Sequence, residues 1–429
     1  MRLRVVVAYL GLLAAFGTVL LVLADRVVGR FVDARFTPLA GAPNARTVLV
    51  RPEFRIPVRT NAAGFRGGPL PGPKAPGVFR IVALGDSFTW GYGVRARQAY
   101  PGRLAARLDA ALRARGRRRR VEVVNLGVPG AGPLDYLWHL EHTGLALHPD
   151  LVLVGLFAND VNDLYQLRRF GARSPLFALD ELRAGAGARP ALWRRAVAAA
   201  VPTLWTLAGR ARARLAASVA PRDAEAAAAP RADPGAMLDA LGARYGRTAA
   251  LRARYAALAP ADRAALDGLL AGRPVGSDVR PVLLLAALVD PDAEADAVLL
   301  RSPERRAAFE ETGRVLERLI DEARRHGART TLAVFPAAEQ VDRSRWPVLA
   351  RAGFRLDPAM LTDTTYADGL RAIAARAGAG FVDLVAVFRA RGAAGRYFRQ
   401  DEHWNARGQA LAAARLAAAI LPEIPDTDG

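Results

Sequence analysis

The stretch Val78-Phe-Arg-Ile-Val-Ala-Leu-Gly-Asp-Ser87 decides the fold, because a buried strand in it runs directly into a polar turn. Residues 78–84 form a near-continuous apolar run, which is typical of a strand covered on both faces of a sheet. Gly85 permits a sharp turn before Asp86 and Ser87. The carboxyl ends of strands in an open parallel sheet are where ligands bind, so Ser87 is a candidate for chemistry. The alternative is that Asp86 and Ser87 only cap the next segment.

Strand and helix patterns alternate on both sides of this stretch. Apolar runs that predict strands occur at 121–125, 151–157, 330–335 and 380–384. Patterns that predict helices begin at Pro101 and cover about 133–147, 303–326, 366–377 and 406–420. This order predicts an α/β fold of three layers, αβα, with a central parallel sheet covered by helices on both faces.

The segments outside this pattern divide the chain further. Residues 25–77 are rich in Pro, Gly and Arg and are predicted to be a linker and N-terminal embellishment, with an edge strand at 48–50. The main domain is predicted in two parts, 78–164 and 303–421, followed by a tail at 422–429. A helical insertion over 165–302 separates the two parts. Within it, 281–286 is either a strand or a buried helix turn.

The N-terminus has the pattern of a membrane segment. Residues 1–4 are basic, and residues 5–24 are uncharged and apolar, which matches the roughly 20 residues that cross a bilayer core. We therefore predict a cytoplasmic N-terminus at 1–4, a transmembrane helix or signal anchor over 5–24, and the main domain on the extracytoplasmic side. The basic residues before the segment favour this orientation, and Arg26 and Arg30 after it oppose it. A cleaved signal peptide is the alternative, although its apolar part normally has about 7–15 residues.

The composition narrows the classes of partner and chemistry. The formal net charge is +20, but Lys74 is the only lysine and the arginines are scattered along helical stretches. This pattern favours solvated helix faces over a nucleic-acid surface, so we predict no nucleic-acid partner. The chain has no cysteine, which excludes disulfides, thiolate catalysis and Cys-ligated metal.

A serine nucleophile needs a base, and His403 is the best candidate. It lies in the polar loop Asp401-Glu-His-Trp-Asn405 before the last predicted helix. Asp401, two residues earlier, is spaced to accept the Nδ1 hydrogen of the imidazole, which leaves Nε2 free to take a proton from Ser87. The other four histidines lie on or beside predicted helices. The alternative interpretation is a surface histidine beside an acid.

Two further strand ends carry candidate donors for a developing negative oxygen. Asn125-Leu-Gly-Val-Pro-Gly130 follows the second strand and offers a backbone N–H at Gly130, where no side chain blocks a substrate. Asn159, after the third strand, offers a side-chain amide. Each segment alone is more typical of an ordinary turn. Their placement at consecutive strand ends with Ser87 favours a shared site.

In chain order, Gly85-Asp-Ser87, Asn125-x-Gly-x-x-Gly130, Asn159-Asp160 and Asp401-x-His403 resemble the sequence blocks of the SGNH/GDSL hydrolase family. The resemblance covers roughly 80–164 and 330–421, and residues 60–66 look like a segment that precedes the first block in membrane-anchored members. It implies a flavodoxin-like fold and a triad of Ser87 as nucleophile, His403 as base and Asp401 as its orienting acid. It also implies an oxyanion hole from the Ser87 backbone, Gly130 and Asn159, with no metal or cofactor.

Two positions depart from the family pattern. Phe157 stands where many members have a glycine, and it is expected to narrow the pocket beside Asn159. Gln400 stands at the usual acid position, so that Asp401 is one residue closer to His403. The resulting Asp-x-His spacing resembles SGNH-type polysaccharide O-acetyltransferases, including those acting on alginate, and also occurs in presumed esterases.

The sequence therefore predicts a serine hydrolase of carboxylic esters, with acetyl as the leading acyl group, that works through an acyl-enzyme. We expect an acylated small molecule or a glycan as the substrate, with cell-envelope glycans or lipids as candidates, and a single-pass membrane location. One alternative is an O-acetyltransferase, since water exclusion and pocket shape decide the acceptor. The other is a non-catalytic, membrane-anchored binding protein.

Overall fold

The computed structural model describes residues 16–27, 36, 38–185, 197, 200, 201, 204, 232–272 and 277–425. In this part of the chain, five parallel strands form a sheet in the order β4 (Arg120–Asn125), β3 (Val78–Leu84), β5 (Leu151–Phe157), β6 (Arg329–Phe335) and β7 (Gly380–Asp383). The five predicted strands are confirmed. Because β3 pairs with both β4 and β5, the segments that follow these three strands meet at one edge of the sheet.

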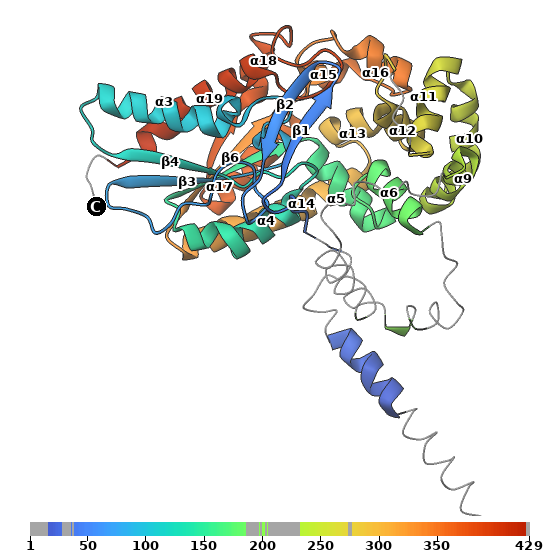
Figure 1. The fold of residues 1–429 in the computed structure, drawn as a ribbon, viewed down its shortest axis with the longest axis horizontal. Helices are drawn as coiled ribbons and strands as arrows, with labels where there is room; N and C mark the ends of the chain where they lie inside the picture. Colours follow the sequence, from blue (N-terminus) through green and yellow to red (C-terminus); the bar gives the residue numbers. More distant parts are fainter. Residues whose placement is uncertain are drawn as a thin grey trace, which may run out of the picture.

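Helices cover both faces of the sheet (Figure 1). One face carries α3 (Tyr100–Ala114), α18 (Leu384–Arg389) and α19 (Ala406–Ile420), and the other carries α4 (Pro133–His139), α14 (Pro303–Arg325) and α17 (Thr365–Ala377). Leu104, Leu108 and Leu112 lie on one face of α3 and pack with Ile81. Val82, on the opposite side of β3, packs with α4 and α14. The predicted αβα layers are confirmed.

Short helical turns complete this domain. The helix predicted over 133–147 is α4 followed by a π-helical turn, Leu140–Gly144, and a 3-10 turn, Leu145–Leu147. The remaining short helices are α15 (Ala338–Val341) and α16 (Trp346–Ala352), with 3-10 turns at Ala96–Gln98, Pro358–Leu361 and Leu421–Glu423.

An antiparallel hairpin precedes the sheet in the chain. β1 (Arg46–Arg51) pairs with β2 (Phe54–Arg59), so the predicted strand at 48–50 exists but pairs outside the central sheet. Ile56 and Val58 of β2 pack on Trp90 of the short helix α2 (Ser87–Trp90). The Arg66 guanidinium lies 4.2 Å from the centre of the Trp90 ring. The hairpin is thereby fixed to the helix that follows β3.

Helices occupy the described chain between β5 and β6. They are α5 (Asn159–Phe170), α6 (Pro175–Gly185), α9 (Pro234–Tyr245), α10 (Thr248–Ala257), α11 (Pro260–Leu270), α12 (Pro281–Val289) and α13 (Ala293–Leu299). The run 281–286, which the sequence leaves open between strand and helix, lies in α12. Apolar side chains of α6, α9, α11 and α12 form a core of their own, next to the sheet domain.

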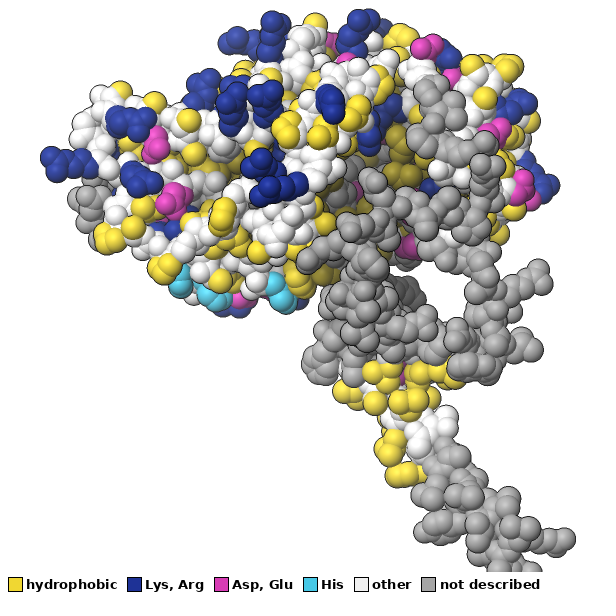
Figure 2. Space-filling model, in the orientation of Figure 1, with side chains coloured by type: hydrophobic (Ala, Val, Ile, Leu, Met, Phe, Trp, Pro, Cys, Tyr) yellow, Lys and Arg dark blue, Asp and Glu magenta, His cyan; other side chains and the backbone are white. Residues whose placement is uncertain are grey.

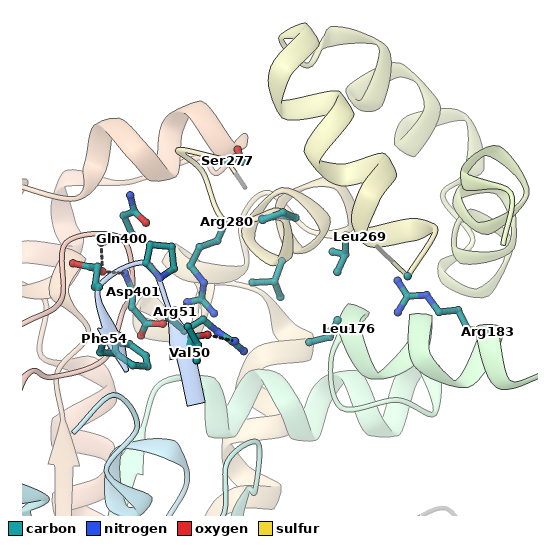
Figure 3. Close-up of a pocket in the computed structure, with 15 residues that line it drawn as sticks. Val50, Arg51, Phe54, Leu176, Arg183, Leu269, Ser277, Arg280, Gln400 and Asp401 are labelled. Atoms are coloured by element: carbon teal, nitrogen blue, oxygen red, sulfur yellow. Dashed lines mark hydrogen bonds and ion pairs between the residues drawn. The ribbon is translucent and has the colours of Figure 1, made fainter. Parts of the chain in front are cut away.

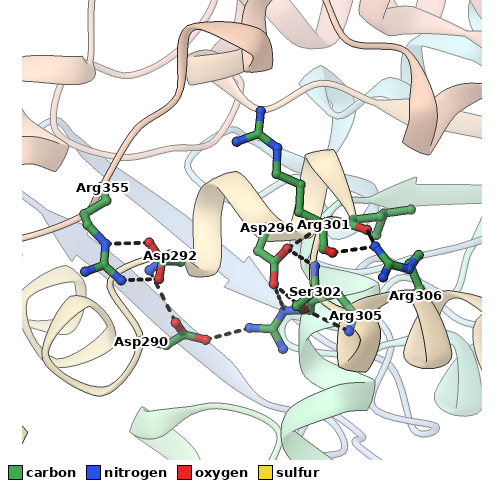
Figure 4. Close-up of polar contacts among 9 residues, drawn as sticks. Asp290, Asp292, Asp296, Arg301, Ser302, Arg305, Arg306 and Arg355 are labelled. Carbon is green, nitrogen blue, oxygen red and sulfur yellow. Dashed lines mark hydrogen bonds and ion pairs between the residues drawn. The ribbon is translucent and has the colours of Figure 1, made fainter.

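Buried polar contacts join this helical region to α14 (Figure 4). Arg305 has only 2% of its side chain exposed, and it donates to the Asp290 carboxylate at 2.7 Å. Its guanidinium also stacks 3.9 Å from the Tyr165 ring. Ser302 caps α14 and donates to Asp296 at 2.5 Å. Because a buried guanidinium is costly unless paired, these partners fix the helical region to α14.

The predicted fold is wrong at the N-terminus. Of the transmembrane helix predicted over 5–24, residues 16–24 lie in a described helix, 16–27, and residues 5–15 lie outside the described residues. No helix in the described part of the chain has the length and apolar character for a membrane crossing, which takes about 20 residues. The predicted N-terminus at 1–4 also lies outside the described residues, as do much of the insertion and residues 426–429.

The arginines lie at several separate places on the face seen in Figure 2, with Asp and Glu among them. Several form ion pairs between helices, such as Arg252 with Asp239 and Arg376 with Glu317. This arrangement agrees with the interpretation of scattered charge on helix faces. The absence of a nucleic-acid partner stays a prediction.

The turn after β3 generates a stability prediction. Gly85 has φ +154°, and an added Cβ would lie 2.1 Å from Thr89 Oγ1 and 3.1 Å from the Gly155 carbonyl oxygen. We expect Gly85→Ala to lower the free energy of unfolding by about 2–4 kcal/mol in urea denaturation. Gly116→Ala is the control, because Gly116 also has positive φ but no atom within 4 Å of an added Cβ. Equal losses in the two variants would contradict the proposed clash.

Candidate active site

Ser87 is placed by the turn between β3 and α2. It is the first residue of α2, and Asp86 caps this helix by accepting the Phe88 backbone N–H at 2.9 Å. The capping interpretation of Asp86 is therefore confirmed. This capping role of Asp86 is compatible with a catalytic role of Ser87, because the Ser87 hydroxyl has a different partner.

That partner is His403, whose Nε2 lies 2.7 Å from Ser87 Oγ. On the other side of the ring, Nδ1 hydrogen-bonds to Asp401 Oδ1, which also accepts the His403 backbone N–H at 3.0 Å. His403 and Asp401 are 6% and 4% exposed, so water is largely kept from this pair. The structure thus brings together the three residues that the sequence singles out, in the order hydroxyl, imidazole, carboxylate.

The charge of Asp401 is held by its surroundings. Burial by itself would raise the pKa of this carboxyl, but the hydrogen bond and charge of His403 and the charge of Arg280 outweigh it. The net result is a pKa of Asp401 well below its usual range. Arg280 Nη1 lies 3.2 Å from Asp401 Oδ2. Asp401 is therefore ionised at neutral pH and available to hold the Nδ1 hydrogen of His403.

Aromatic rings pack against the imidazole. The centres of the Tyr92 and Phe88 rings lie 4.6 Å and 4.9 Å from that of His403. Phe88 also stacks on Phe157 at 4.5 Å. These contacts restrict the rotation of the His403 ring and fix the direction of its Nε2 atom.

The two predicted oxyanion donors follow β4 and β5, the two strands that flank β3. Gly130 is in the turn after β4, with φ +77°, and an added Cβ there would lie 3.1 Å from the Phe177 ring. Asn159 is the first residue of α5, directly after β5, and its Nδ2 lies 3.4 Å from Asp163 Oδ2. Their role at an oxyanion stays a prediction.

A buried acid, Asp160, fixes the end of β5 next to Asn159. Asp160 accepts the Tyr136 hydroxyl at 2.7 Å and the Phe157 backbone N–H at 3.0 Å. Burial raises the pKa of Asp160 well above its usual range. Burial also raises the pKa of Asp86 to about 6, against the opposing hydrogen bond from Phe88. The two hydrogen bonds of Asp160 therefore fix the end of β5, and Asn159, the residue before it, lines a pocket.

That pocket is small and lies between Asn159 and the His403 loop. Its volume is about 80 Å³, and Phe157, Asn159, Glu402 and the small side chains of Ala293 and Ala337 are among the residues that line it. Phe157, where the family pattern has glycine, therefore fills space at this wall. The expected narrowing of the pocket beside Asn159 agrees with this arrangement.

A larger cavity of about 540 Å³ lies next to Asp401 (Figure 3). It is formed by the tip of the β1–β2 hairpin, by α6 and α11, and by the start of α12 with Arg280. Ser87 does not line it. The cavity thus borders the acid of the triad and not its nucleophile.

Sequence reasoning missed two residues that contact the loop of Asp401. Glu53, at the hairpin tip, accepts backbone N–H groups from residues 399–401, and Arg280 pairs with Asp401. Both lie more than a hundred positions away in sequence, and their local patterns are those of a turn and a helix start. Among the described residues, no group of three or more His, Asp or Glu side chains is arranged to hold a metal ion.

Two family models match the chain. Residues 83–278 match the GDSL-like Lipase/Acylhydrolase family, and residues 295–429 match the SGNH hydrolase-like domain of acetyltransferase AlgX. The first match contains Ser87, Gly130 and Asn159, and the second contains Asp401 and His403. No curated protein sequence matches significantly.

Solved structures that are similar to this chain include two acetylxylan esterases and a lipase/acylhydrolase. An acetyl xylan esterase covers 80% of this chain and 100% of its own at 12% identity and a TM-score of 0.36. A lipase/acylhydrolase from Enterococcus faecalis covers 81% of this chain and 98% of its own, at 14% identity and a TM-score of 0.36. An acetylxylan esterase from Geobacillus stearothermophilus covers 80% of this chain and 94% of its own, at 13% identity and a TM-score of 0.37.

The low pKa of Asp401 generates a pH prediction. A carboxyl whose pKa is lower in the folded than in the unfolded chain stabilises the fold above its unfolded pKa of about 4, and this contribution is lost as the pH falls. We expect the wild type to lose stability more steeply than Asp401→Asn between about pH 5 and pH 3, measured by urea denaturation. Parallel curves for the two proteins would show that Asp401 is not held ionised in the fold.

Proposed function

We propose that this chain, which is an enzyme of the SGNH/GDSL type and thus an ester hydrolase or a related acyltransferase, acts through an acyl-enzyme on Ser87. The observation that carries the proposal is the 2.7 Å contact between Ser87 Oγ and His403 Nε2, with ionised Asp401 behind the imidazole. Hydroxyl, base and orienting acid are the groups that a serine nucleophile requires.

The first half of the reaction forms the acyl-enzyme. Ser87 Oγ passes its proton to His403 Nε2 and forms a bond to the ester carbonyl carbon. The negative oxygen that develops is stabilised by the Ser87 and Gly130 backbone N–H groups and by the Asn159 amide, which turns away from Asp163. The carbon–oxygen bond to the alcohol then breaks, and His403 returns the proton to the leaving oxygen.

The second half releases the acyl group. Water, or the hydroxyl of an acceptor, gives a proton to His403 Nε2 and attacks the acyl carbon. The bond between the acyl carbon and Ser87 Oγ then breaks, and His403 returns the proton to Ser87 Oγ. Asp401 stays ionised throughout and holds the Nδ1 hydrogen, so the ring presents Nε2 in both halves. Hydrolysis and transfer differ only in which hydroxyl reaches the acyl-enzyme.

The acyl group is proposed to be short, with acetyl as the leading candidate. The small pocket of about 80 Å³ supports this size, because it is lined by Asn159, the proposed oxyanion donor, and by Phe157, while Ser87 lies outside its lining. A cell-envelope glycan that carries acyl esters is the proposed substrate class. The alternative of a non-catalytic binding protein is set aside, because both matching family models describe enzymes.

Acyl transfer to a sugar hydroxyl is the second candidate. The match of residues 295–429 to an acetyltransferase domain favours it, because this segment holds Asp401 and His403 with their Asp-x-His spacing. Incubation of the protein with p-nitrophenyl acetate and an oligosaccharide, followed by mass spectrometry, separates the two. Acetylated oligosaccharide supports transfer, and release of acetate alone supports hydrolysis.

The proposed nucleophile and base generate a direct prediction. We expect wild-type protein to turn over p-nitrophenyl acetate, and Ser87→Ala and His403→Ala to lower kcat at least about 10⁴-fold. His142→Ala is the control, because His142 lies in an exposed turn and stacks on Trp138. Wild-type rates in both Ser87→Ala and His403→Ala would show that the proposed site is wrong.

The pocket beside Asn159 generates a prediction about acyl length. Removing the Phe157 ring enlarges this pocket, so Phe157→Ala should raise kcat/KM for p-nitrophenyl butyrate relative to the acetate by about 10-fold. Phe170→Ala is the control, because Phe170 packs on Tyr245 in the helical region, away from this pocket. An unchanged ratio in Phe157→Ala would mean that the acyl chain lies elsewhere.

A further inference from the structure

The tip of the β1–β2 hairpin contacts the loop that carries the acid and the base. The Glu53 carboxylate accepts three backbone N–H groups: that of Arg399 at 2.5 Å, that of Gln400 at 2.7 Å and that of Asp401 at 3.0 Å. Successive amides that point at one anion form an anion-binding nest. Hydrogen bonds to an ionised acceptor are about twice as strong as neutral ones. The backbone of this loop is thus held at Asp401 and at the two residues before it.

The loop has a shape that makes this contact effective. The Phe398 N–H donates to the His403 carbonyl at 3.0 Å, and Tyr397 pairs with Trp404. Residues 399–402 are therefore the tip of a closed turn. The amides that Glu53 binds belong to this tip, so the position of Asp401 depends on where the hairpin holds it.

The same hairpin contacts the nucleophile helix. Ile56 and Val58 pack on Trp90 in α2, the helix that begins with Ser87. Phe54, next to Glu53, packs on the Tyr92 ring at 5.7 Å, and Tyr92 in turn packs on the His403 ring at 4.6 Å. One short hairpin thus contacts the helix of the nucleophile and the backbone of the acid directly, and reaches the ring of the base through Tyr92.

We infer that the hairpin sets the relative position of Ser87 and the Asp401–His403 loop, and that Glu53 is the positioning residue through which it holds the loop. Glu53 does not touch the reacting atoms. It acts by keeping Asp401 Oδ1 against His403 Nδ1 while Nε2 faces Ser87. The inference rests on the proposed function, because it assigns Glu53 a role toward that triad. Displacement of a catalytic group by about 1 Å costs on the order of 100-fold in rate.

The test uses the full-length chain and three substitutions. Glu53→Ala removes all three acceptor contacts, and Glu53→Gln keeps one acceptor oxygen without the charge. Arg55→Gln, on the exposed side of the same hairpin, is the matched control. For p-nitrophenyl acetate we expect Glu53→Ala to lower kcat about 10- to 100-fold with KM within about 2-fold of the wild type. The kcat of Glu53→Gln should lie between the values for Glu53→Ala and the wild type, and the kcat of Arg55→Gln should equal that of the wild type.

Hydrogen exchange gives a readout that is independent of turnover. In Glu53→Ala the amides of residues 399–401 should exchange faster than in the wild type, while those of β3 and β5 stay unchanged. Wild-type kcat in Glu53→Ala, or unchanged exchange at 399–401, overturns the inference. Equal loss of protection in β3 and β5 also overturns it, because the role would then be general stability. If wild-type turnover survives Ser87→Ala, the proposed function fails first, and the exchange result still decides whether Glu53 holds the loop.

Discussion

The parallel pairing of β3 with β4 on one side and β5 on the other is the constraint on which the rest of the structure depends. It brings three successive strand ends to one edge of the sheet, and each end carries a polar segment where the chain leaves the apolar core. Ser87 follows the middle strand, Gly130 lies in the turn after β4, and Asn159 begins α5 after β5. Because β3 and β5 are buried along their whole length, this edge is rigid, and a serine at the turn after β3 keeps a fixed direction.

The other half of the site depends on segments outside the sheet. The loop of Asp401 and His403 follows the last strand by almost twenty residues and has no strand to fix it. Its backbone is bound by Glu53 of the hairpin, and the Asp401 carboxylate is paired with Arg280 at the start of α12. A hairpin before the sheet and a helical region within the domain thus both contact Asp401, and together they border the cavity beside it.

The sequence predicts most of the sheet and the candidate triad, because both depend on local patterns. Apolar runs mark the five strands, and Ser87, Asp401 and His403 stand out by residue type and position in polar loops. Glu53 and Arg280 are not predictable in this way. The contacts of Glu53 span 346 to 348 positions in the sequence. The residues around Glu53 show only the pattern of a turn, and those around Arg280 only that of a helix start. The apolar run 281–286 fits a buried strand as well as a buried helix. Its helical state in α12 is decided by its packing in the helical region. The prediction of a transmembrane helix rested on hydropathy alone, and the described residues contain no such helix.

The central claim is that Ser87 is a nucleophile activated by His403. Covalent labelling with a fluorophosphonate, followed by peptide mapping of the modified residue, tests it most directly, because the probe reacts with activated serines and needs no knowledge of the substrate. The account predicts one label per chain, on Ser87, and a much slower reaction in His403→Ala. An unlabelled Ser87 in folded protein, or equal labelling rates with and without the His403 imidazole, would contradict it.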